Sequence, residues 1–130
     1  MGKTLIDSNV IIDYLGRTLP VPGVKFVSIE RKKGFKLSII TRIELLGSRI
    51  LKTDLSLITE FIGSSTIIDL DDNVAEKAIQ IRQNHSIQLA DSIIAATALV
   101  HDLILVTRNV RDFKSVPLLK LVNPWLRHIK

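Results

Sequence analysis

Cysteine is absent from the sequence, and histidine occurs only three times among its 130 residues. Without cysteine the chain has no disulfide bonds, no thiolate metal ligands and no cysteine nucleophile, a composition typical of a reducing cytoplasm. The histidines, His85, His101 and His128, are scattered, which argues against a zinc site. We therefore expect a cytoplasmic protein whose chemistry rests on other side chains.

Long hydrophobic runs are absent as well. No apolar stretch reaches the about 18 uninterrupted residues that a membrane-spanning helix needs. Near the N-terminus, Asp7 interrupts a short apolar run, which is too short for a secretion signal. These absences predict a protein that contacts no membrane.

Apolar and basic residues dominate what is present. The composition is 46% hydrophobic, enough for one well-buried core, and we expect a single domain over residues 1–130. The formal net charge is +5 and the isoelectric point is near 9.7. This charge favours polyanionic partners, such as RNA, DNA or an acidic protein segment.

Short β-type runs alternate with longer helical patterns along the chain. The apolar runs predict strands at residues 3–6, 36–40, 66–70, 103–107 and 118–124, the last of them at an edge of the sheet. Helical patterns occupy residues 8–16, 24–34, 41–51, 55–63, 74–85 and 91–102. Because strands that are apolar on both faces need cover on both sides, the alternation predicts an α/β fold, a three-layer α/β/α sandwich around a parallel sheet of four to five strands.

Capping signals predict where two of the helices begin. Asn9 is placed to cap the first helix, which Gly16 would end. Thr41 and Glu44 have the spacing of a capping box, so Thr41 is expected to cap the helix that contains Glu44.

Acidic residues gather at one edge of the predicted sheet. In open parallel α/β sheets, functional residues collect in the crevice beyond the carboxyl ends of the strands. Asp7 closes the first strand, and Glu44 lies in the first turn of the helix after the second. Asp91 opens the helix before the fourth strand, and Asn109 and Asp112 follow that strand. Each acid also has a structural alternative, as a turn residue, a capping-box member or an N-cap.

Several carboxylates in one crevice would raise one another's pKa values unless a cation compensated them. Carboxylate oxygens without histidine or cysteine suit Mg²⁺ or Mn²⁺. Such a site can activate water and stabilise the displacement at a phosphodiester. The residues thus predict a metal-dependent nuclease, although their spacing alone also fits a phosphatase-like crevice.

Four blocks of the sequence carry a resemblance to a known family. In chain order they read "LIDSNVIIDYL", "SIITRIELLGS", "LADSIIAATALVHDLILVTRNVRDF" and "VPLLKLVNPW". They resemble the PIN domain, and particularly the VapC-type toxins of toxin–antitoxin pairs. The resemblance implies a Mg²⁺-dependent endoribonuclease with Asp7, Glu44 and Asp91 at its metal site, RNA as substrate and a cognate antitoxin as partner. We also expect a homodimer. A PIN nuclease that processes RNA without an antitoxin and a non-catalytic RNA-binding PIN domain remain alternatives.

One position departs from the acidic pattern that the resemblance implies. Many PIN domains have an aspartate two residues beyond the threonine that ends the fourth strand, and this chain has Asn109 there, after Thr107. Asp112 is our preferred source of the fourth carboxylate, and Asn109 is kept as the alternative. The hydroxyls of Ser8 and Thr107 are candidates for orienting a water molecule, or else ordinary cap and turn groups.

Other features have weaker functional interpretations. The apolar residues Ile11, Leu15, Leu45 and Ile50 form either an antitoxin groove or part of the core. The apolar stripe of the helix at 91–102 is expected in the core or at a dimer contact.

A basic run and the single tryptophan also have two possible roles each. Arg31, Lys32, Lys33 and Lys36 are expected to be a solvated helix end, with phosphate steering as the alternative. Trp125 is expected to pack against the C-terminal edge rather than to stack on a base.

Overall fold

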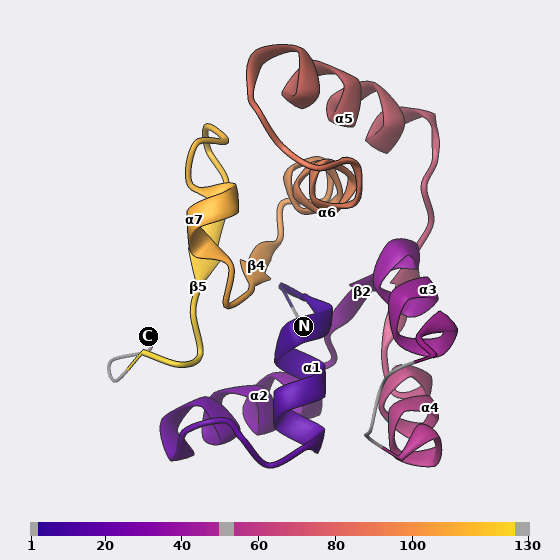
Figure 1. Ribbon diagram of the computed structural model, residues 1–130, viewed down its shortest axis with the longest axis vertical. Coiled ribbons are helices and arrows are strands. Elements are labelled where there is room, and N and C mark those ends of the chain that lie inside the picture. Colours follow the sequence, from indigo (N-terminus) through magenta and orange to yellow (C-terminus); the bar gives the residue numbers. More distant parts are fainter. Residues whose placement is uncertain (1–2, 50–53, 127–130) are drawn as a thin grey trace.

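A parallel sheet forms the centre of the computed structural model, which describes residues 3–49 and 54–126 (Figure 1). Its five strands lie in the order β3-β2-β1-β4-β5 and all their pairings are parallel. The strands are β1 (Thr4–Ile6), β2 (Lys36–Ser38), β3 (Thr66–Ile68), β4 (Ile104–Val106) and β5 (Lys120–Val122). The α/β fold is therefore confirmed, and β5 is the edge strand that the sequence predicted.

Seven helices are described, and they cover both faces of this sheet. They are α1 (Ser8–Leu15), α2 (Val21–Lys33), α3 (Ile39–Gly47), α4 (Leu55–Gly63), α5 (Asp72–Asn84), α6 (Leu89–Val100) and α7 (Val110–Phe113). Figure 1 shows α5 and α6 on one side of the strands, and α1, α2, α3 and α4 on the other. The predicted three-layer sandwich is thus present.

Alternation along the strands divides the core into two parts. Leu5 and Leu105 point to the side of α5 and α6, whereas Ile6 and Val106 point to the side of α1, α2 and α4. All four side chains are at most 1% exposed, because both faces of the sheet are covered. Helix α6 lies between the sheet and α5, and its residues from Ser92 to Ala98 are all buried. This confirms that its apolar stripe belongs to the core.

Two helices begin earlier than their capping signals predicted. Asp7, not Asn9, caps α1, by accepting a hydrogen bond from the Ser8 N–H, although α1 ends at Gly16 as expected. Helix α3 begins at Ile39, capped by Ser38, so the predicted capping box of Thr41 and Glu44 is wrong.

The β-branched pair Ile39–Ile40 caused this second error, because it resembles a continuation of β2. Thr41 instead lies inside α3, where it is 1% exposed and its hydroxyl has no hydrogen-bond partner among the described residues. A short helix, α7, which the sequence patterns did not predict, follows β4.

The strand order produces a crevice at the centre of the sheet. From β1 the chain moves outward through β2 to β3, and then returns to β4 on the opposite side of β1. The connections that leave β1 and β4 therefore diverge to opposite sides, which opens a crevice at their carboxyl ends. The candidate residues follow those two strands or lie on helices that begin at the same edge.

Two of the alternatives left open by the sequence depend on burial and position. Ile11 and Leu45 are 0% and 1% exposed, so they are core residues and not part of a surface groove. Leu15 is half-buried beside the same cluster, and Ile50 lies outside the described residues.

The basic run of Arg31, Lys32, Lys33 and Lys36 lies at the amino ends of the strands. It ends α2 and leads into Lys36, the first residue of β2, so it lies opposite the carboxyl ends of the strands. Within it, Arg31 contacts Glu60 at 3.7 Å and Lys33 contacts Glu30 at 3.6 Å. No described helix is long and apolar enough to cross a membrane.

Candidate functional site

Asp7 is the most enclosed of the candidate acids. It follows β1, where its N–H donates to the Val106 carbonyl of the neighbouring strand at 2.9 Å. Its carboxylate is 5% exposed and accepts hydrogen bonds from the Thr107 hydroxyl at 2.8 Å and the Ser8 N–H at 2.9 Å. Burial raises the pKa of this carboxyl above its ordinary value, while the hydrogen bonds from Thr107, Ser8 and Asn9 oppose the rise.

Glu44 reaches the same place from α3. Its Oε1 accepts a hydrogen bond from the Ser8 hydroxyl at 2.8 Å, although the two residues are 36 positions apart. Ser8 thus contacts both acids, since its N–H donates to Asp7. The predicted role of Ser8 in orienting a water stays a prediction, but its position between Asp7 and Glu44 is established.

Asp91 has the most perturbed environment of the three. It lies in the first turn of α6, whose N-cap is Gln88, so Asp91 does not cap the helix. Burial raises the pKa of its carboxyl to about 6, with further contributions from the negative charges of Asp7, Asp112 and Glu44. Four carboxylates from four separate segments are therefore close enough to interact.

The segment after β4 brings polar groups to the other side of the crevice at the carboxyl ends of β1 and β4. The Thr107 hydroxyl donates to Asp7 and accepts from the Asn109 N–H at 3.0 Å, so it holds the start of this segment against β1. Asn109 and Asp112 are both exposed on α7 or at its start. The structure brings both residues to the site, and which of them completes it stays a prediction.

Two adjoining clefts contain these residues. The first, here called the acidic cleft, has a volume of about 330 Å³ and is lined by Asp7, Ser8, Glu44, Asp91 and Asn109, together with neighbouring residues. The second, here called the flanking cleft, has a volume of about 480 Å³. Asp91 lines both clefts, whereas Asp112 lines only the flanking cleft. Asp112 therefore approaches Asp91 from the flanking cleft and not from the acidic cleft.

The donor set agrees with a hard divalent ion that retains water. Within residues 3–49 and 54–126, no three Asp, Glu or His side chains are arranged so that they alone would hold a metal ion. Mg²⁺ is often bound by one or two carboxylates together with water and substrate phosphates, so it does not need a complete protein cage. Burial is the largest cause of the raised pKa of Asp91, but the charges of Asp7, Asp112 and Glu44 also contribute to it, and a cation would relieve that repulsion.

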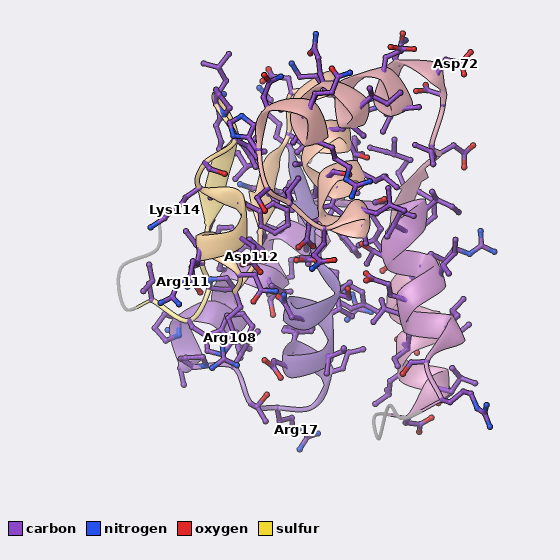
Figure 2. The ribbon with its side chains drawn as sticks, turned by 45° about the horizontal axis from the view of Figure 1, so that its top comes forward. Arg17, Asp72, Arg108, Arg111, Asp112 and Lys114 are labelled. Atoms are coloured by element: carbon purple, nitrogen blue, oxygen red, sulfur yellow. The ribbon has the colours of Figure 1, made fainter. Side chains whose placement is uncertain are left out.

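Several contacts at the site could not be identified from the sequence. The Asn9 side chain donates to Asp7 at 3.3 Å and accepts from the Arg108 N–H at 3.2 Å, so it ties α1 to the segment after β4. Arg108 contacts Asp13 at 3.8 Å, and its guanidinium lies 4.9 Å from the centre of the Trp125 ring. Trp125 is half-buried, in agreement with its expected packing role. Figure 2 shows Arg108, Arg111 and Lys114 on the same part of the molecule as Asp112.

Comparisons with known proteins identify the family to which the chain belongs. The sequence matches the PIN domain family over residues 4–119. A toxin–antitoxin complex from Klebsiella pneumoniae contains a similar chain, with 28% identity, a TM-score of 0.73, and 93% of this chain and 97% of that chain covered. FitAcB from Neisseria gonorrhoeae is similar too, with 28% identity, a TM-score of 0.75, and coverage of 94% and 98%.

A third solved structure shares the fold. DNA-bound VapBC from Salmonella typhimurium has 24% identity, a TM-score of 0.76, and coverage of 93% and 97%. No protein of curated function matches the chain in sequence. Because the family match extends from β1 nearly to β5 and the fold agrees with it, this chain belongs to the PIN-domain family.

Proposed function

We propose that this protein is a Mg²⁺-dependent endoribonuclease and the toxin component of a VapBC-type toxin–antitoxin pair. The observation that carries the proposal is the convergence of Asp7, Glu44, Asp91 and Asp112: burial, together with the negative charges of the other three, raises the pKa of Asp91 to about 6. Such a group of acids suits a divalent cation, and PIN nucleases generally use one. Two of the similar structures, from Klebsiella pneumoniae and Salmonella typhimurium, are toxin–antitoxin or VapBC complexes, which supports the choice of system.

The residues of the chain have distinct roles in this proposal. Asp7, Glu44 and Asp91 would hold the ion, and Asp112 would add negative charge beside Asp91. When bound, Mg²⁺ polarises a phosphate oxygen and lowers the pKa of a water molecule. Thr107 and Asn9 orient Asp7 by hydrogen bonds, and Ser8 links Asp7 to Glu44. These contacts fix the carboxylates before substrate arrives, which reduces reorganisation during the reaction.

An antitoxin is the partner that we propose, and exposed apolar side chains of α3 and α4 are its candidate contact surface. Ile43 and Leu46 on α3 are 60% and 40% exposed, and Leu55 and Leu57 on α4 are 60% and 44% exposed. As the proposed antitoxin contact, these exposed positions take the place of Ile11 and Leu45, which are buried in the core. Replacement of Ile43 by Glu should weaken the complex with the antitoxin while leaving RNA cleavage by the free protein intact.

A cleavage assay tests the enzymatic part of the proposal. The purified protein is incubated with total RNA and Mg²⁺ or Mn²⁺, and the ends of the products are mapped. We expect cuts that require the metal, that cease with EDTA, and that are absent with Asp7→Asn. Cleavage that is equal in metal-free buffer would exclude the metal site.

A growth assay separates the toxin from its alternatives. Expression of this protein alone should arrest growth, and Asp7→Asn or co-expression of the adjacent small gene should restore it. Metal-dependent cleavage without growth arrest would favour an RNA-processing PIN nuclease. Binding of RNA without any cleavage would favour the non-catalytic alternative. The homodimer remains a proposal that light scattering of the purified protein would test.

A further inference from the structure

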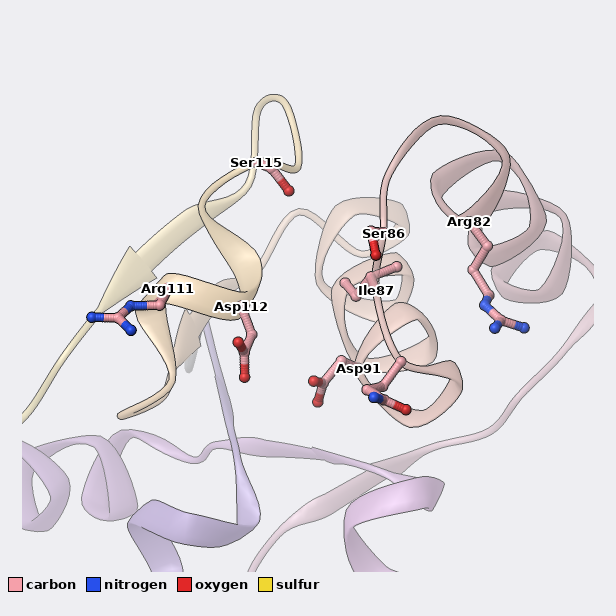
Figure 3. Close-up of a pocket in the computed structure, with 8 residues that line it drawn as sticks. Arg82, Ser86, Ile87, Asp91, Arg111, Asp112 and Ser115 are labelled. Atoms are coloured by element: carbon pink, nitrogen blue, oxygen red, sulfur yellow. The ribbon is translucent and has the colours of Figure 1, made fainter.

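The flanking cleft lies directly beside the acidic cleft but has a different chemistry. Apart from Asp91 and Asp112, its lining consists of Arg82, Ser86, Ile87, Gln88, Arg111 and Ser115. Figure 3 shows Asp91 and Asp112 reaching toward the same gap from α6 and α7, with Ser86 on one side and Ser115 on the other. The cleft thus continues the acidic cleft into a region bordered by neutral polar groups and two cations.

The neutral lining groups are free to bind a ligand. The side chains of Ser86, Gln88 and Ser115 have no hydrogen-bond partner among the residues that the structure describes, and all three are exposed. An amide and two hydroxyls together supply both donors and acceptors. A ligand made only of phosphates would need donors alone, whereas the edge of a nucleobase offers donors and acceptors side by side.

The two arginines of the lining complement a nucleic-acid backbone. Arg82 and Arg111 form no ion pair with any acid in residues 3–49 and 54–126. In Figure 3 their side chains extend outward on opposite sides of the cleft, which leaves its middle open. Guanidinium groups at the two rims can contact phosphates on either side of a nucleotide, and the volume of about 480 Å³ is within the range of small-ligand pockets.

Both walls of the cleft lie close in sequence to the acidic residues. The carbonyl of Gln88 accepts the hydrogen bond from the Ser92 N–H at 2.9 Å, so Gln88 is fixed at the start of the helical turn that carries Asp91. Ser115 follows α7, which carries Asp112, and the Val116 N–H donates to the Phe113 carbonyl at 3.0 Å. A group bound between these walls would therefore have a defined position relative to the carboxylates.

We propose that the flanking cleft binds the nucleotide next to the scissile phosphate of single-stranded RNA, with Gln88, Ser86 and Ser115 contacting its base and Arg82 its backbone. The proposal rests on the endoribonuclease function proposed above. Single-stranded RNA fits because its bases can leave the stack and present their edges to polar side chains. The cleft would then select where the chain is cut, while the acidic cleft performs the cleavage.

Three variants and a control test the proposal on a set of short single-stranded RNA oligonucleotides with varied sequence. Arg82→Gln should raise KM about tenfold with little change in kcat, and should lower the slope of log affinity against log salt by about one. Gln88→Ala should relax the preference for one nucleotide beside the cut by about tenfold. Ser115→Trp fills the cleft without removing an acid, so it should raise KM but keep the thermal stabilisation by Mg²⁺.

Lys77→Gln is the matched control for the loss of positive charge. Lys77 lies on α5 like Arg82, but it donates to Gln80 at 3.3 Å and lines a different depression. It should leave KM, kcat and the cut positions unchanged. If all three cleft variants retain the KM and cut positions of the unaltered protein, the proposal is wrong. If they instead lose only affinity for the antitoxin, the cleft belongs to the protein partner and the proposal is equally wrong.

A failure of the proposed function can be distinguished from a failure of this inference. If the unaltered protein does not cut RNA with Mg²⁺, the endoribonuclease assignment fails. Binding of a labelled RNA oligonucleotide, measured by fluorescence anisotropy, then decides about the cleft. Weaker binding by Arg82→Gln than by Lys77→Gln supports it as an RNA site, and equal binding by the two variants overturns it.

Discussion

Replacement of Asp91 by Asn should stabilise the metal-free protein while it abolishes the response to Mg²⁺. In the fold, burial and the charges of Asp7, Asp112 and Glu44 raise the pKa of Asp91 from its ordinary value of 3.8 to about 6. A group whose pKa is higher in the folded than in the unfolded state stabilises the fold while it is protonated. That contribution is complete below the unfolded pKa and is lost as the pH rises through about 6.

The size of the effect follows from the pKa and from the exposure of the carboxylate. At about 1.4 kcal/mol per pKa unit, the rise corresponds to at most about 3 kcal/mol. Asp91 is only half-buried, so solvent screening reduces this, and we expect a gain of about 1 kcal/mol for Asp91→Asn at neutral pH. For a domain of this size that is about 3–5 °C in melting temperature.

The assay is thermal unfolding with EDTA and with excess Mg²⁺, near pH 5 and near pH 7.5. With EDTA, Asp91→Asn should melt higher than the unaltered protein near pH 7.5, and the difference should shrink near pH 5, where Asp91 is largely protonated. With Mg²⁺ the order should reverse, because only the unaltered protein gains binding energy from the ion.

Asp72→Asn is the control, since Asp72 also lies in the first turn of a helix and loses the same favourable interaction with the helix dipole. Figure 2 shows Asp72 at a corner of the molecule away from Asp112. This variant should be slightly destabilised and should respond to Mg²⁺ like the unaltered protein. The reasoning is refuted if Asp91→Asn is the less stable protein in EDTA at neutral pH, or if Mg²⁺ stabilises both proteins equally.

Three further outcomes follow from the site. Thr107→Val removes the hydroxyl that donates to the buried Asp7 carboxylate, so it should lower the free energy of unfolding by about 1–3 kcal/mol. A urea titration measures this, and an unchanged free energy of unfolding would contradict the role of this hydrogen bond. Asp112→Asn should reduce metal-dependent cleavage more than Asn109→Ala does; the opposite order in initial rates would make Asn109 the fourth residue of the site. RNA affinity should fall steeply as the salt concentration rises, and it should be higher for single strands than for duplexes. Filter binding at several salt concentrations measures both; an affinity that does not change with salt would show that the basic surface plays no part.

Much of the site could be predicted because its residues mark the ends of recognisable elements. Asp7 ends an apolar run, Asp91 lies in the first turn of a helical pattern, and Glu44 lies on the helix after the second strand, so their edge of the sheet follows once the strands are known to be parallel. The resemblance of four blocks to PIN domains agreed with that assignment, and the family match confirmed the resemblance itself. Local caps were less predictable, since Ser38 and Thr41 are both suitable N-caps and only the length of β2 decides between them.

By itself the sequence determined the alternation of strands and helices, the two-sided burial of the sheet and the position of the acids at strand ends, because these depend on residue types and short spacings. Only the tertiary structure decided that β1 and β4 are neighbours, that Thr107 donates to Asp7 across 100 positions, and that Ile11 and Leu45 are core rather than surface. It also decided that the link between α5 and α6 faces α7 across the flanking cleft. Such contacts depend on which elements pack together, and no local pattern of residues encodes the strand order that brings them into contact.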